Sequence, residues 1–131
     1  MQFKNKEIIQ YYENLEEAYF KNDNSTKYLP AKITFKILKN FKILKLLSED
    51  IYLIRDKIIQ HYGVPDPEDN NFFIISEDKK DIAQKELDDL IELEQEVNIL
   101  MLKFSDIENL EFTMNQMEAL MFMIEEDQVE A

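Results

Sequence analysis

The sequence predicts a mainly helical α+β protein with three to four helices, one of them long (about 30–62), and a small two- or three-stranded sheet. The 131 residues include one glycine and three prolines, so the chain has few places to turn and long helices are expected. Apolar residues make up 45% of the chain, which favours a folded core although 33% of the residues are charged. At this length we expect residues 1–131 to form a single domain.

The N-terminal region predicts a short strand followed by a helix. The first residues, MQFK, alternate as a strand does. Asn5 is the predicted N-cap of a helix that runs to about Phe20, because apolar residues after it recur at helical spacing. These residues are Ile8, Ile9, Tyr12, Leu15 and Tyr19. The polar stretch KNDNSTK then predicts a loop.

Pro30 and Gly63 mark the ends of the predicted long helix. Proline suits the first turn of a helix, and glycine suits the left-handed position just past its end. Between them an apolar seam repeats in steps of four and three, with Asn40 and His61 in its two polar slots. The seam consists of Ile33, Ile37, Leu44, Leu47, Ile51, Ile54 and Ile58. Such a seam needs a partner, either other helices of this chain or a second copy.

The middle of the chain predicts a turn, a short apolar segment, a helix and a strand. VPDPEDN is a turn, and NFFIIS is either a strand or a loop anchor. Ser76 or Asp78 can cap a helix from about Lys79 to Glu94. After it, EVNILMLKF changes to an alternating pattern, which predicts a buried strand that can pair with the N-terminal strand.

The last predicted helix has the clearest local signature. Thr113 and Gln116 form a capping box, and Phe112 and Met117 suit a hydrophobic staple, so the helix should begin at Met114. Its predicted apolar stripe contains Met117, Leu120, Met121 and Ile124. The tail EEDQVEA is expected to fray into solvent.

The composition argues against catalysis and cofactors. The chain has no cysteine, one histidine and one glycine, so it lacks a thiolate metal site, a nucleophile–base pair and a phosphate-binding loop. We therefore expect a protein that is not an enzyme, with no catalytic residues, no metal and no cofactor. The lack of cysteine suits a reducing compartment, and no stretch approaches the roughly 20 apolar residues of a membrane span. A soluble cytoplasmic protein with no membrane partner is the expectation.

Charge is divided unevenly along the chain. Its formal charge is −13, with +3 on residues 1–63 and −16 on residues 64–131. A lysine run without any Asp or Glu contains Lys27, Lys32, Lys36, Lys39, Lys42 and Lys45. Either this lysine run packs beside the acidic half and neutralises it, or the acidic half imitates nucleic acid towards a basic protein. The net charge argues against direct binding of nucleic acid.

Two groups of residues are predicted to contact a partner protein. Acidic residues of the helix near 79–94 are predicted to line its exposed side and to engage a basic groove. They are Asp81, Glu86, Asp88, Asp89, Glu92, Glu94 and Glu96. Phe35, Ile43 and Leu46 fall among the lysines on the side of the long helix away from the seam. This apolar group is either covered by further helices or forms an exposed contact patch.

Four stretches cover most of the chain: MQFKNKEII, LPAKITFKILKNFKILKLLSEDIYLIRDKIIQHYG, ELDDLIELEQEVNILMLKF and FTMNQMEALMFMIEE. Their order resembles an uncharacterised family of small proteins encoded by phages and prophages of low-GC Gram-positive bacteria. The chain departs from the resemblance at PDPEDNNFFII, where family members often carry a glycine-containing turn. The resemblance implies a phage setting and brings no catalytic residue with it.

Within that setting we expect a non-enzymatic protein that binds a host or phage protein. The first hypothesis is an inhibitor of a host defence or nucleic-acid-binding protein, of the anti-CRISPR kind, that uses its acidic surface. The alternative is a virion assembly or scaffolding protein, as a homodimer through the long helix.

Overall fold

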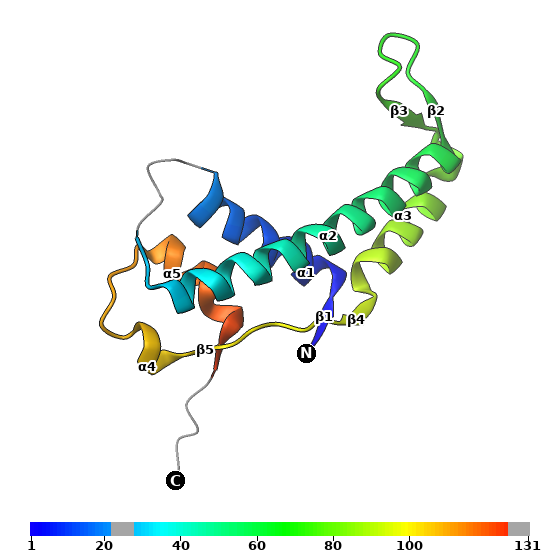
Figure 1. Cartoon of the computed structure of the whole chain (residues 1–131). Coiled ribbons are helices and arrows are strands. Elements are labelled where there is room, and N and C mark those ends of the chain that lie inside the picture. The colour runs from blue at the N-terminus through cyan, green and yellow to red at the C-terminus, as the bar shows by residue number, and fades with distance from the viewer. Residues whose placement is uncertain (22–27, 126–131) are drawn as a thin grey trace.

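The computed structural model describes residues 1–21 and 28–125, and it confirms the predicted mainly helical class (Figure 1). Within these ranges lie four helices of seven residues or more: α1 (Asn5–Leu15), α2 (Ala31–Tyr62), α3 (Glu77–Glu92) and α5 (Met114–Leu120). The one-turn helix α4 (Phe104–Ile107) was not predicted. Small two-stranded sheets join the helices. No described helix combines the length and the apolar character needed to cross a bilayer.

Helix α2 is the long axis of the molecule and has nearly the predicted bounds (Figure 1). At 1.5 Å per residue, its 32 residues span about 48 Å. Pro30 precedes the helix as its N-cap, with extended backbone. The prediction of a left-handed Gly63 is wrong, because its φ of −105° and ψ of 170° are extended. Glycine is needed there for another reason: a Cβ would lie 2.8 Å from the carbonyl oxygen of Ile59.

The buried face of α2 follows a straight helix, so the heptad prediction holds only in part. The face consists of Ile33, Ile37, Asn40, Leu44, Ser48 and Ile51. Ser48 takes the place predicted for Leu47, and Ile54 is 47% exposed. A straight helix turns every 3.6 residues, so it drifts away from a strict 3.5-residue seam. The partners of this face are other elements of the chain, chiefly α1 and the segment after α3.

Helix α1 begins one residue away from its predicted cap. Lys4 is the N-cap, and its backbone N–H donates to Glu7 at 2.9 Å. Asn5 is instead the first helical residue and is buried, because its side chain bonds to the end of α3 and to β4. The helix continues as a π-helical turn, η1 (Glu16–Phe20).

The predicted pairing of the N-terminal strand holds only in part, because Glu96 alone of the predicted partner strand takes part in it. Strand β1 (Gln2–Lys4) pairs antiparallel with β4 (Glu94–Glu96). The single long strand predicted over EVNILMLKF is wrong, because residues 97–101 belong to no strand and β5 (Leu102–Lys103) begins only after them. Asn40 explains the gap: its side chain donates to the carbonyl oxygen of Leu100 at 2.9 Å and accepts from its N–H at 2.8 Å.

Two further strand pairs are short. Strands β2 (Gly63–Pro65) and β3 (Phe73–Ile75) form an antiparallel hairpin, which confirms the strand alternative for NFFIIS. The hairpin projects from the C-terminal end of α2 (Figure 1). Strand β5 pairs in parallel with β6 (Ile124–Glu125).

The capping box of α5 is confirmed. Thr113 accepts from the backbone N–H of Gln116 at 3.1 Å, and Gln116 accepts from that of Thr113 at 3.0 Å. The helix ends earlier than its predicted stripe, and a 3-10 turn, η3 (Met121–Met123), follows. Met121 is therefore 61% exposed while Met123 is buried. Of the predicted fraying tail only Glu125 is described, and it lies in β6; 126–131, like 22–27 of the predicted loop, lie outside the described residues.

One cluster of buried side chains joins α1, α2, α5 and the strands near them. Its fully buried members are Ile8, Leu15, Leu44, Leu102, Leu120 and Met123. Helix α3 contributes little, since only Ala83 and Leu90 of its residues are buried. The C-terminal half of α2, the hairpin and α3 thus form a thin arm beyond the core, which we call the distal arm (Figure 1).

Candidate interaction surface

Helix α3 lies along the C-terminal half of α2, and its buried residues decide which face is exposed. Ser76, one of the two predicted caps, is the N-cap residue, although its side chain makes no cap hydrogen bond. The helix therefore begins at Glu77, two residues before the predicted start. Ala83 and Leu90 lie two turns apart on the same face, and both are buried. Near the end of α2, the Tyr62 hydroxyl donates to Glu86 at 2.9 Å and ties the two helices together.

The C-terminal end of α3 is set by α1. The backbone N–H of Asn5 donates to the carbonyl oxygen of Leu93 at 2.8 Å. The helix therefore stops at Glu92, and Leu93 has extended backbone. The prediction that Glu94 and Glu96 lie on this helix is wrong, because both belong to strand β4.

The exposed face of α3 carries an acidic stripe, defined as Asp78, Asp81, Asp88 and Glu92. At 100° per residue these four side chains point away from the buried face, and all four are exposed. Lys85 lies on the same face in the gap of the stripe. The stripe covers 15 residues, which is 14 steps of 1.5 Å, or about 21 Å along the helix. Its carboxylates lie in a line, as the phosphates of a nucleic-acid strand do, although Glu92 at the end of the line is paired with Lys4 and Lys6.

The acidic residues of α3 differ in the partners that they have within the chain. Asp89 is 3.0 Å from the ammonium of Lys85, and Glu86 accepts the bond from Tyr62. Asp88 accepts from the side-chain amide of Gln84 at 2.9 Å, which leaves its charge uncompensated. The side chain of Asp81 makes no hydrogen bond or ion pair with any residue that the structure describes.

Two predicted site residues hold the N-terminal region in place. Glu92 accepts from Lys6 at 2.6 Å and from Lys4 at 2.9 Å, and these bonds lower the pKa of its carboxyl group. Glu96 accepts from the N-terminal ammonium at 2.6 Å, which lowers the pKa of Glu96 in the same way. Both carboxylates therefore have positive partners within the chain.

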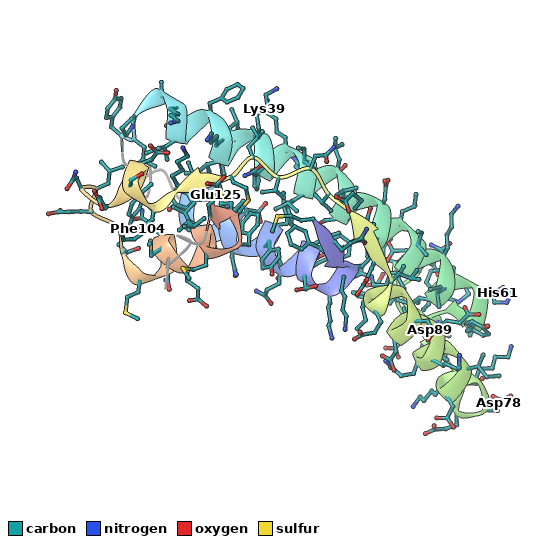
Figure 2. All side chains as sticks on the ribbon, turned by 90° about the horizontal axis from the view of Figure 1, so that it is seen from below. Lys39, His61, Asp78, Asp89, Phe104 and Glu125 are labelled. Carbon is teal, nitrogen blue, oxygen red and sulfur yellow. The ribbon has the colours of Figure 1, made fainter. Side chains whose placement is uncertain are left out.

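The lysine run and the acidic helix lie at opposite ends of α2, so the run does not neutralise α3. In Figure 2 Lys39 lies far from Asp78 and Asp89. Of the described lysines in the run, Lys32 is 3.4 Å from Asp106, and Lys36 donates to the carbonyl oxygen of Met101 at 2.7 Å. Lys27 lies outside the described residues. The charge asymmetry of the sequence is thus also a separation of charge in space.

The predicted apolar group on α2 contains two exposed side chains and one that is partly buried. Phe35 is 55% exposed and Leu46 is 64% exposed. Ile43 is partly buried and packs against the core. The ammonium of Lys39 lies 5.6 Å from the centre of the Phe35 ring. The patch therefore exists in reduced form, without Ile43.

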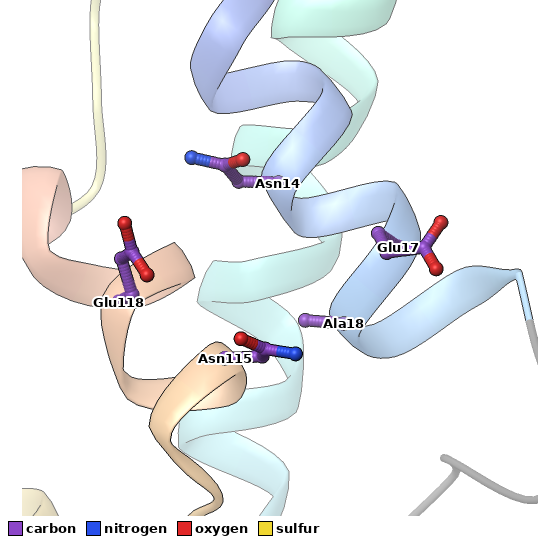
Figure 3. A pocket seen from close by; sticks show the side chains of 5 residues that line it. All are labelled: Asn14, Glu17, Ala18, Asn115 and Glu118. Carbon is purple, nitrogen blue, oxygen red and sulfur yellow. The ribbon is translucent and has the colours of Figure 1, made fainter.

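A shallow hollow of about 180 Å³ lies between the end of α1 and α5 (Figure 3). Its lining is Asn14, Glu17, Ala18, Asn115 and Glu118. Glu17 is already 3.3 Å from the ammonium of Lys21. Residues 1–21 and 28–125 contain no group of three His, Cys, Asp or Glu side chains that could hold a metal ion. The side chains that line the hollow can make polar contacts, but they include no nucleophile and no positively charged group.

Sequence reasoning placed Asp81, Asp88 and Glu92 on the exposed face of α3 and missed two residues there. The sequence predicts Asp78 only as a possible N-cap of the helix, and it predicts no role for Lys85. The signal that could have found both is the spacing of 78, 81, 85, 88 and 92, which alternates in steps of three and four.

No protein-family model, curated protein or solved structure matches this chain. The resemblance to phage proteins and the function that it implies therefore stay predictions.

Proposed function

We propose that this chain is a non-enzymatic, phage-type binding protein whose acidic stripe on α3 docks into the basic, nucleic-acid-binding groove of a host protein. It would act in the host cytoplasm as an inhibitor of the anti-CRISPR kind, by occupying a site meant for nucleic acid. The observation that carries this proposal is the line of exposed carboxylates along the outer face of α3.

The setting of the stripe supports the proposal. Residues 77–96 carry nine acidic and three basic side chains, a net charge of −6. The distal arm holds the charges of α3 beyond the core and away from the lysine run (Figure 2). Charges arranged in this way steer an oppositely charged partner and resist like-charged competitors such as nucleic acid.

Affinity capture from host cells, followed by mass spectrometry, tests the proposal. We expect recovery of a basic nucleic-acid-binding protein, with capture that weakens as salt rises from about 0.1 M to about 0.5 M. The test variant reverses the stripe residues Asp81 and Asp88 and the neighbouring Asp89 to lysine, and it should lose the partner. Glu92 is left intact because its bonds to Lys4 and Lys6 belong to the fold.

The matched control reverses Glu108, Glu118 and Glu125, which are exposed outside α3, and so changes the net charge equally. It should keep the partner. Equal capture by both variants would refute the stripe as the contact surface. Recovery of capsid or tail proteins instead would support the assembly or scaffolding alternative.

A further inference from the structure

The solvent-facing side of α2 carries a second regular seam, opposite the buried one. It consists of Phe35, Lys39, Lys42, Leu46, Glu49 and Leu53, in alternating steps of four and three. Phe35, Leu46 and Leu53 are 55%, 64% and 56% exposed, and the three charged members are exposed as well. We call this set the outer seam. Its spacing is that of a helix that packs lengthwise on another helix.

The charges of the outer seam are separated along the helix. Lys39, Lys42 and the neighbouring Lys45 precede Leu46, whereas Glu49 and Asp50 follow it. Leu46 itself lies at the middle of α2, which runs from Ala31 to Tyr62. A two-fold axis through Leu46 would therefore align two copies of α2 over their whole length in antiparallel orientation.

From this arrangement we propose that the chain forms an antiparallel homodimer through the outer seam of α2. The axis brings Leu46 against Leu46 of the second copy and places Lys42 beside Glu49 and Asp50 of that copy. Lys39 then lies about one helical turn from Asp50 of the second copy. Each pair of opposite charges occurs twice, because an interface on a two-fold axis repeats every contact.

The charges of the outer seam favour a second copy of the chain as the partner, in antiparallel orientation. A parallel dimer would place the three lysines of one copy against the same lysines of the other. An anionic lipid surface would attract the lysines but would meet Glu49 and Asp50 between the two exposed leucines. Only the antiparallel second copy turns both halves of the seam into favourable pairs.

The proposed dimer is weak and closed. Half of the six positions of the outer seam are charged, so the interface has little apolar contact, and association at micromolar or higher concentration is expected. The buried face of α2 is already used by the core. A two-fold interface uses the outer seam of both copies, and so it closes the assembly at two. The interface leaves the acidic stripe of each copy uncovered, and the dimer therefore does not depend on the function proposed above.

Sedimentation equilibrium from about 10 µM to about 1 mM gives the first test. We expect a reversible monomer–dimer equilibrium. Leu46→Glu should raise the dissociation constant at least about tenfold, since it places two like charges on the axis. Met114→Glu is the matched control, because Met114 is 89% exposed away from the seam, and it should leave the equilibrium unchanged. A monomer at every concentration would overturn the proposal.

Charge exchange and crosslinking test the orientation. Lys42→Glu should weaken the dimer, and combining it with Glu49→Lys and Asp50→Lys should restore it. Because the chain has no cysteine, Leu46→Cys should form a disulfide across the axis on oxidation. Phe35→Cys should not, since the two copies of position 35 would lie about 33 Å apart.

Two results contradict the antiparallel dimer. Equal crosslinking of the Leu46→Cys and Phe35→Cys variants would indicate a parallel pair. Pelleting of a monomeric chain with phosphatidylserine vesicles, lost in Leu46→Glu but kept in Met114→Glu, would assign the outer seam to a lipid surface. Circular dichroism of each variant separates loss of association from loss of fold.

Discussion

The side-chain amide of Asn5 donates a hydrogen bond of 2.8 Å to the carbonyl oxygen of Leu90, and this bond joins the first turn of α1 to the last turn of α3. Asn5 also accepts a bond of 2.8 Å from the side chain of Gln95. The partly positive N-terminal end of α1 thus meets the partly negative C-terminal end of α3. One buried side chain thereby anchors the distal arm to the core.

Removal of the Asn5 side chain should destabilise the protein. Asn5→Ala leaves a buried carbonyl without its donor, which costs about 1–3 kcal/mol in the free energy of unfolding. Urea denaturation followed by circular dichroism measures the loss. The control is Asn98→Ala, an exposed site where we expect a change within about 0.5 kcal/mol. Equal stability of the two variants would show that the bond does not anchor α3.

Asn40 should be irreplaceable by an apolar residue although it lies in the apolar seam. Its side chain is 0% exposed and binds both backbone groups of Leu100. Asn40→Leu would leave the N–H and the carbonyl oxygen of Leu100 without hydrogen-bond partners. We therefore expect the free energy of unfolding to fall by about 2–4 kcal/mol. Thermal denaturation gives this value, and Asn71→Leu in the exposed hairpin loop serves as the control. An unchanged midpoint for Asn40→Leu would mean that the segment near Leu100 is held by other contacts.

Replacement of Gly63 by alanine, which adds only a methyl group, should destabilise the protein. In Gly63→Ala the new Cβ would lie 2.8 Å from the Ile59 carbonyl oxygen and 3.1 Å from the Cβ of Phe73, so the hairpin must shift. We expect a loss of about 1–3 kcal/mol and faster amide hydrogen exchange in β2 and β3. Val64→Ala, at a neighbour in the same strand that is 63% exposed, is the control and should change stability and exchange little. Unchanged exchange in the hairpin would argue against close packing at Gly63.

Acid should weaken the protein partly through Glu92. The bonds from Lys6 and Lys4 hold the pKa of Glu92 below its ordinary value in the folded state. A depressed folded-state pKa stabilises the protein above the unfolded-state pKa, and this stabilisation is lost as pH falls through the folded-state pKa. We expect the melting temperature to fall between about pH 5 and about pH 3, and to fall less in Glu92→Gln. Glu108→Gln, an exposed change without such partners among the described residues, should follow the wild-type curve.

Several elements could be predicted because their causes lie within a few residues of chain. Pro30 and Gly63 bound α2, and the bonds between Thr113 and Gln116 start α5. The stripe residues Asp81 and Asp88 were predicted on the exposed side for a similar reason, since helical spacing alone separates them from Ala83.

Local patterns in the chain specify the helical class, the bounds of α2 and the imbalance of charge, because propensity, capping and composition act locally. Packing sets where α3 ends, interrupts the strand predicted near 96–104 and keeps the lysine run far from α3. Each of these depends on packing between distant parts of the chain, such as Asn5 with Leu90 and Asn40 with Leu100. A buried backbone group takes whichever partner the packed helices bring within reach, and no local pattern specifies that partner.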